Sequence, residues 1–311
     1  MKTTADSARV NGSSLYAKYC RPKLSDLIES VKLDSVYTRA RGPYLFRQNP
    51  VSGEEEQVLD LVGGFGAGLF GHNNPEIKDF LKARLDEDIP FLAQSSQREE
   101  AGRLAKHINE LLPGEESYIC HLANSGAEAV EAILKHAYKV RFDDLRRTFE
   151  RVARMIEEFF QQTDRDYPDI EVPGSERDLG KFRDDLDEHN LAQFESFQNN
   201  PVVLALKGSF HGKTSSALKM TFNKTYREGF EGLSGIRPNF IDPTDIERLE
   251  DIVKEHQVEF LIPKVEDRRI VIETMSYSTI IALCIEVIQG EGGIHPLSDT
   301  VLRQLADRRS S

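Results

Sequence analysis

Apolar and polar positions alternate along the chain with two different periods, and together they predict an α/β fold. Five consecutive apolar residues at 202–206 and a similar run at 282–287 suit strands that are buried on both faces of a parallel sheet. The segment 118–123 is also predicted as a strand, and it leads into an amphipathic helix over 126–139. Because strands and helices follow one another in turn, we expect a mostly parallel sheet flanked by helices.

The N-terminal part of the chain predicts a small hairpin followed by helices. Asn74, Pro75 and Glu76 form a helix start, because a capping Asn precedes a proline and an acidic residue in the first turn. This helix is expected to continue to about Leu85. The other expected elements are a disordered tail over 1–14, a short helix over 24–33, strands over 44–46 and 58–62 joined by a polar turn around Ser52 and Gly53, and a helix over 98–112.

Residues 141–200 differ from the rest of the chain, because two long helical patterns follow one another with no strand between them. Apolar residues recur at helical spacing on both sides of a break at 168–174, which predicts an inserted helical hairpin. The segment has 16 acidic and 9 basic residues, so its net charge is −7. The simpler interpretation is a solvated decoration whose two apolar stripes face each other. A docking surface for another protein is the alternative, since an aromatic-rich stripe needs cover.

Composition and charge narrow the class of protein. The 311 residues are 39% hydrophobic and 30% charged, which is typical of a soluble globular protein. The net charge of −12 argues against nucleic acid as a main partner, because phosphate groups need basic patches. The longest apolar run, 280–288, contains Glu286 and is too short to span a bilayer, and residues 1–14 lack the apolar core of a signal peptide. Three widely spaced cysteines and no metal-ligand spacing favour free thiols in a reducing cytoplasm.

The turn at residues 125–127 is the first candidate for chemistry. It lies at the predicted start of a helix, where free backbone N–H groups and the positive end of the helix dipole attract an anion. Ser125, Gly126 and Ala127 are small enough to let a phosphate approach. Ser125 and Glu128 also fit the S-x-x-E capping box that many helices carry. From the turn alone, both a phosphate site and a plain helix cap remain open.

Four blocks of sequence, in this order, give the chain a family resemblance. They occupy residues 60–76, 120–137, 207–214 and 285–293 and read DLVGGFGAGLFGHNNPE, CHLANSGAEAVEAILKHA, KGSFHGKT and IEVIQGEGG. The blocks resemble the class III aminotransferases, which use pyridoxal phosphate, have the type I fold and include ornithine, acetylornithine and 4-aminobutyrate aminotransferases. The resemblance runs from about residue 40 to the C-terminus and is interrupted by the insertion. It implies amino-group transfer from an amine or amino acid to a 2-oxo acid.

The resemblance also implies a pyridoxal 5'-phosphate site in two of these blocks. The block over 120–137 would hold the phosphate, with the backbone N–H groups of its turn as donors. The block over 207–214 would stack an aromatic ring on the ring of the cofactor and shape the loop beside it. The residues that the resemblance assigns to the cofactor are Ser125, Gly126 and Ala127 for the phosphate, Phe210 for the stacking, and His211 and Gly212 for the loop.

Three further residues are assigned by resemblance to the substrate side of the site. Glu286 would lie at the wall of the substrate cavity, and a valine follows it where the family commonly has a proline. Gly64 and Phe65 match a region that often lines the substrate mouth, sometimes across a dimer interface. In domain terms, the resemblance implies an N-terminal segment over 1–75 and a partial cofactor-binding large domain over 76–311. The region 259–288 is longer than the family needs, and its segment 260–281 is expected to add one or two strands.

Two chemical groups of the family are not expected in this chain. In the family, the aspartate that pairs with the pyridine nitrogen and the lysine that forms the Schiff base both follow the Glu286 block. No lysine occurs here after Lys264. We therefore expect no catalytic residue of the family in this chain, weak and non-covalent cofactor binding, and no activity of the chain alone.

Several situations fit this pattern and remain open. The chain can be a fragment of a longer product, one half of a split enzyme, or a non-catalytic paralogue that binds a protein partner through the acidic insertion. For the first two, the expected partners are an amino donor, a 2-oxo acid, and either a second copy of the chain in a homodimer or a complementing C-terminal half. Neither nucleic acid nor a membrane is expected as a partner.

Overall fold

The computed structural model describes residues 12–49, 51–90, 93, 95–114, 116–167, 170–173, 178–233 and 235–307. Most of the expected tail over 1–14 therefore lies outside the described residues. The chain divides into two compact units, Met1–Gln97 and Arg98–Ser311, and each is described by itself. This division falls later in the chain than the boundary at residue 75 that the resemblance implies, and that domain assignment stays a prediction. No helix among the described residues is long and apolar enough to cross a membrane.

The first unit is built on a three-stranded antiparallel sheet. Strands β2 (Tyr44–Gln48) and β3 (Glu55–Leu59) form the predicted hairpin, and β1 (Tyr37–Arg41) pairs with the other side of β2. The predicted helix start is confirmed, because the Asn74 side chain accepts hydrogen bonds from the N–H groups of Glu76 and Ile77. The helical elements of this unit are α1 (Gly12–Tyr19), α2 (Pro22–Ser30), η1 (Gly63–Gly66) and α3 (Pro75–Asp86).

The second unit contains the predicted parallel sheet. Strand β4 (Val202–Leu206) lies between β5 (Arg237–Ile241) and β8 (Ile280–Cys284), and both pairings are parallel. All five residues of β4 are buried, as its unbroken apolar run predicts. Besides the elements described below, this unit also contains α4 (Glu99–Leu111), α7 (Ser215–Met220), α8 (Lys224–Arg227), η2 (Pro243–Arg248), α9 (Leu249–Glu255), β9 (Ile288–Gln289), β10 (His295–Pro296) and α10 (Asp299–Asp307).

The strand predicted over 118–123 is wrong. This segment has no regular structure, and the Ile119 side chain is fully exposed. A strand needs a neighbour for its backbone hydrogen bonds, and no described strand pairs with this segment. Instead, the Asn109 side chain of α4 bonds both backbone groups of Tyr118. It donates to the Tyr118 carbonyl at 2.9 Å and accepts from the Tyr118 N–H at 2.6 Å.

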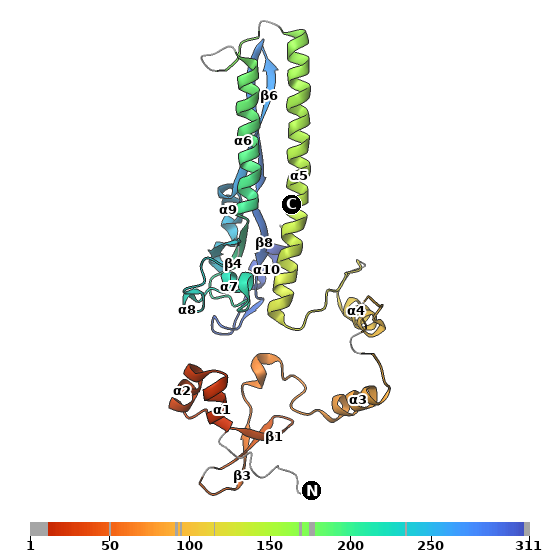
Figure 1. Cartoon of the computed structure of the whole chain (residues 1–311), viewed down its shortest axis with the longest axis vertical. Helices are drawn as coiled ribbons and strands as arrows, with labels where there is room; N and C mark the ends of the chain where they lie inside the picture. Colours follow the sequence, from red (N-terminus) through yellow and green to blue (C-terminus); the bar gives the residue numbers. More distant parts are fainter. Residues whose placement is uncertain are drawn as a thin grey trace. The chain divides into compact units, whose positions relative to one another are not determined.

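The predicted helical hairpin of the insertion is confirmed, with one difference. The helix expected over 126–139 and the first helix of the insertion are a single helix, α5 (Gly126–Asp166), and the second helix is α6 (Leu179–Asn199). The segment before β8 adds two strands, β6 (Gln257–Glu266) and β7 (Arg269–Ser278), which form a separate antiparallel hairpin. Helices α5 and α6 run side by side along β6 (Figure 1).

The apolar stripes of the two insertion helices do more than face each other. Leu145 and Ile156 of α5, Phe197 of α6 and Phe260 of β6 belong to one buried cluster. The aromatic rings of Phe149 and Phe260 lie 6.0 Å apart, measured between centroids. The cover that the aromatic stripe needs is therefore supplied by the β6–β7 hairpin of the same chain, and this stripe is not free to dock another protein.

Side chains of α6 also replace a neighbouring strand along one edge of β6. The Asn190 side chain, which is 2% exposed, donates to the Leu261 carbonyl at 2.9 Å and accepts from the Leu261 N–H at 2.8 Å. The Gln193 amide accepts from the N–H of Glu259 at 3.1 Å. These bonds satisfy backbone groups that an edge strand otherwise leaves unpaired.

Replacing Asn190 by leucine is therefore expected to destabilise the fold by about 2–4 kcal/mol, because two backbone groups of Leu261 lose their partners in a buried position. Urea unfolding followed by circular dichroism measures this change. The matched control is Gln193→Leu on the same helix, which removes one bond at the exposed Glu259 and should cost less than about 1 kcal/mol. Equal losses in the two variants would show that the Asn190 bridge is incidental.

Candidate functional site

The three later blocks of the resemblance meet where the parallel strands β4 and β8 end. Ligands of open α/β sheets bind at this carboxyl edge of the strands. The block over 207–214 follows β4 directly, and the block over 285–293 follows β8. The backbone N–H of Phe210 donates to a carboxylate oxygen of Glu286 at 2.9 Å, which joins the two blocks.

The turn before α5 combines both interpretations that the sequence left open. The Ser125 side chain accepts from the N–H of Glu128 at 3.2 Å, and the Glu128 carboxylate accepts from the N–H of Asn124 at 2.7 Å, so a helix cap is present. The N–H groups of Gly126 and Ala127 have no partner among the described residues. A Cβ at Gly126 would meet no atom within 4 Å. The cap therefore leaves two donors and open space at the helix N-terminus.

Gly212 packs the second block directly against this turn. Its φ angle is +129°, and a Cβ there would lie 2.8 Å from the Cβ of Ala127 and 3.1 Å from that of Ala217. Only glycine combines this backbone conformation with this close approach. The structure thus brings Ala127 and Gly212 together.

A carboxylate that sequence reasoning missed fixes the same junction. Glu131 of α5 accepts hydrogen bonds from the Thr214 hydroxyl at 2.7 Å and from the N–H groups of Ser216 and Ala217 at 2.7 and 3.1 Å. Burial works to raise the pKa of Glu131, but these hydrogen bonds outweigh it and hold the pKa below its ordinary value. The available signal was spacing, because Glu131 lies four residues after Ala127 on one face of the helix.

His211 lies between these groups with an incomplete set of hydrogen bonds. Its backbone N–H donates to the Thr221 hydroxyl at 3.1 Å. The ring nitrogen Nε2, by contrast, is buried and has no partner among the described residues. Burial lowers the pKa of His211, and the nearby Glu286 carboxylate opposes that shift. The imidazole is therefore neutral near pH 7, and Nε2 is available to a group that enters the site.

Phe210 makes an aromatic contact with a residue that the sequence did not single out. The Phe210 and Tyr226 rings meet edge to face, with centroids 6.0 Å apart and an angle of 79° between the planes. The Lys213 ammonium lies over the other ring of this pair, 4.1 Å from the Tyr226 centroid. Tyr226 follows a helix cap at Asn223, but nothing in its neighbourhood indicated a role in the site.

Gly64 and Phe65 belong to a glycine-rich loop of the first unit. Gly63, Gly64 and Phe65 all adopt left-handed φ angles, of 53°, 60° and 54°, which is unusual for a phenylalanine. The Phe65 side chain is 97% exposed. The structure therefore presents this aromatic side chain on the surface of its unit.

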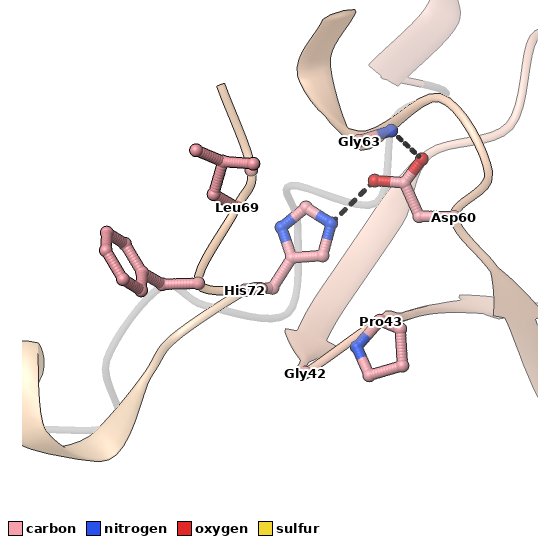
Figure 2. Close-up of a pocket in the computed structure, with 9 residues that line it drawn as sticks. Gly42, Pro43, Asp60, Gly63, Leu69 and His72 are labelled. Carbon is pink, nitrogen blue, oxygen red and sulfur yellow. Dashed lines mark hydrogen bonds and ion pairs between the residues drawn. The ribbon is translucent and has the colours of Figure 1, made fainter. Parts of the chain in front are cut away.

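Hydrogen bonds to one carboxylate close the base of this loop. Figure 2 shows Asp60 between the N–H of Gly63 and the ring of His72, at distances of 3.0 and 2.8 Å. These bonds, first that from Gly63 and then that from His72, lower the pKa of Asp60. Beside them is a cavity of about 340 Å³. It is lined by Gly42, Pro43, Asp60, Gly63, Gly68, Leu69, Phe70, Gly71 and His72.

Comparison with known proteins finds aminotransferases among the relatives of this chain. The chain is 28% identical over 293 residues to the aminotransferase PigE of Serratia sp., covering 93% of this chain and 24% of that protein. It is 27% identical over 279 residues to the acetylornithine aminotransferase of Aquifex aeolicus, covering 89% of this chain and 51% of the relative. It is 25% identical over 266 residues to a [LysW]-aminoadipate semialdehyde/glutamate semialdehyde transaminase of Sulfolobus acidocaldarius, covering 83% and 47%. The chain thus spans about half or less of the length of these relatives.

Solved structures confirm the fold class. A transaminase from the marine bacterium Virgibacillus superimposes with a TM-score of 0.58 at 15% identity, covering 96% of this chain and 52% of that one. An amine transaminase from an uncultivated Pseudomonas species, in its pyridoxal-phosphate-bound form, gives 0.52 at 19% identity, covering 89% and 50%. The family model Aminotransferase class-III matches residues 28–308, and the chain belongs to that family.

Proposed function

We propose that this chain forms the phosphate-binding and ring-binding side of a pyridoxal phosphate site for amino-group transfer between an amine or amino acid and a 2-oxo acid. The observation that carries the proposal is the convergence of Ala127, Gly212, Phe210 and Glu286 at the carboxyl ends of β4 and β8. Family membership supports the same reaction class. By itself, we expect the chain to bind the cofactor weakly and non-covalently.

The described residues fit this cofactor. Two unpaired N–H groups and open space at Gly126 suit a phosphate dianion, and the orphaned Nε2 of His211 suits a polar group of the ligand. The bound cofactor would supply an electron sink. The N–H groups of Gly126 and Ala127 would hold the phosphate, and Phe210, fixed by its bond to Glu286, would orient the ring. The Glu128 carboxylate at the cap competes with the anion for the same helix end, which favours weak binding.

The edge of strand β8 and the residues after it support the proposal that another chain covers this part of the surface. Strand β8 is paired on one edge only among the described strands, and the side chains of Val287 and Ile288 that follow it are 55% and 59% exposed. An unpaired strand edge beside exposed apolar residues invites cover by another chain. We propose that a second copy of the chain in a homodimer, or a complementing C-terminal half, covers this edge. The substrates would be an amino donor and a 2-oxo acid, with Gly64 and Phe65 at the mouth of the substrate cavity. The compartment would be the cytoplasm.

Binding of inorganic phosphate and of pyridoxal phosphate, measured by calorimetry, tests the proposal. We expect Gly126→Val to weaken both by about tenfold or more, because the added side chain occupies the space above the free N–H groups and displaces charge-assisted hydrogen bonds. The matched control is Gly102→Val in α4, where a Cβ also meets open space. It should bind both ligands as the unchanged chain does.

The contrary result is equal binding by the unchanged chain and by the Gly126→Val variant, which would make the turn a plain helix cap. Absorbance in the visible range with and without borohydride adds a second readout. We expect borohydride to fix no cofactor at this site, because binding is non-covalent. If the chain binds neither ligand, the non-catalytic interaction protein becomes the better description.

A further inference from the structure

Tyr226 connects the two loops that form the candidate site, although it belongs to neither. Its ring meets Phe210 edge to face, and the Lys213 ammonium lies over its face. The Glu291 carboxylate, in the block after β8, acts on its hydroxyl: its charge and then a hydrogen bond raise the pKa of Tyr226. One side chain from α8 therefore contacts the block over 207–214 through its ring and the block over 285–293 through its hydroxyl.

We propose that Tyr226 is a positioning residue that sets the orientation of the Phe210 ring, and through it the binding of the cofactor ring. This inference rests on the proposed function and deepens it. Phe210 has a fixed backbone, because its N–H donates to Glu286, and its ring meets one described aromatic ring, that of Tyr226. An edge-to-face aromatic pair is favourable beyond burial alone and depends on geometry, so it selects one ring orientation.

The surroundings of Tyr226 hold the tyrosine itself in place. The Glu291 charge and hydrogen bond raise the pKa of Tyr226, so the phenol stays protonated and can donate to that carboxylate. Asn223, which caps α8, lies 3.5 Å from the same carboxylate. The Lys213 ammonium attracts the face of the ring, as a cation does over an aromatic system. These contacts leave the edge of the ring toward Phe210 well defined.

Comparing the affinities for two ligands separates this positioning role from a merely structural one. Inorganic phosphate needs only the turn at Gly126 and Ala127, whereas pyridoxal phosphate also needs the Phe210 ring. Tyr226→Leu is therefore expected to lower the affinity for pyridoxal phosphate by about threefold to tenfold and to leave the affinity for inorganic phosphate unchanged. Tyr226→Phe keeps the ring and should stay within about twofold of the unchanged chain for both ligands.

A double-mutant cycle tests whether Tyr226 acts through Phe210. Phe210→Leu should lower the affinity for pyridoxal phosphate at least as much as Tyr226→Leu does. The double variant should lose little more affinity than Phe210→Leu alone. Full additivity, equal loss of phosphate affinity, or unchanged pyridoxal phosphate affinity in Tyr226→Leu would each overturn the inference. If the unchanged chain binds neither ligand, the proposed function fails first, and this inference falls with it.

Discussion

Supplied with pyridoxal phosphate and an amino donor, the 311-residue chain by itself is expected to transfer no amino group above the buffer control. The reaction needs a lysine that forms an imine with the cofactor, and no lysine occurs after Lys264. Each lysine of the site region has another partner. Lys207 lies 3.9 Å from Asp242, Lys213 lies over Tyr226, and Lys219 bonds the carbonyl of Glu231.

A coupled assay for the 2-oxo acid released from the donor measures this directly. The acetylornithine aminotransferase of Aquifex aeolicus, run in the same assay on its own substrate, is the positive control. Turnover that scales with the concentration of the chain would contradict the prediction. In that case a variant series of Lys207, Lys213 and Lys219 to arginine identifies the lysine responsible.

Gly212→Ala is expected to destabilise the second unit by about 3 kcal/mol or more, and to abolish phosphate binding at the turn. Two costs combine at this position. The φ angle of +129° is strained for any residue with a Cβ, and the new Cβ would lie 2.8 Å from that of Ala127. Relief requires the first turn of α5 to move away from the loop, which displaces the N–H groups that hold the phosphate.

Thermal unfolding and phosphate calorimetry check both parts of this prediction. The matched control is Gly229→Ala, where φ is also positive, at +82°, but a Cβ would meet no atom within 4 Å. That variant should cost only about 1 kcal/mol for its backbone conformation and should bind phosphate normally. Similar losses in the two variants would mean that the contact with Ala127 does not hold the site together.

Local patterns predicted those parts of the fold whose causes are local. The apolar run of β4, the cap at Asn74 and the cap at Ser125 each depend on a few neighbouring residues, and the structure confirms them. The segment over 118–123 failed because a strand exists only beside a partner strand, which an apolar sequence does not guarantee. The continuity of α5 was also missed, since a family helix and an inserted helix share one period.

In the candidate site too, the residues in local motifs could be predicted from the sequence, and those with distant contacts were harder to predict. The turn and the loop over 210–212 could be named because each carries a recognisable local motif. Tyr226 could not, and for Glu131 the spacing from Ala127 places it on the right helix face without naming its partner, because these contacts join segments that are distant in sequence, as when Glu131 bonds the Thr214 hydroxyl 83 residues away. The assigned roles of Glu286, Gly64 and Phe65 at the substrate side stay predictions.

The dependence of the insertion on the β6–β7 hairpin has a consequence for how such a chain can evolve. If α6 and the outer part of α5 were deleted, Val258, Phe260 and Ile262 of β6 would face water, and each buried side chain of this size is worth about 1.5–3 kcal/mol. The sum approaches the whole stability of a typical domain, about 5–15 kcal/mol. Deleting the hairpin instead would strip the helices of the same cover. Two stretches separated in the gene by the strands of the family fold must therefore be inherited together, and a lineage that loses one of them is bound to lose or rebuild the other.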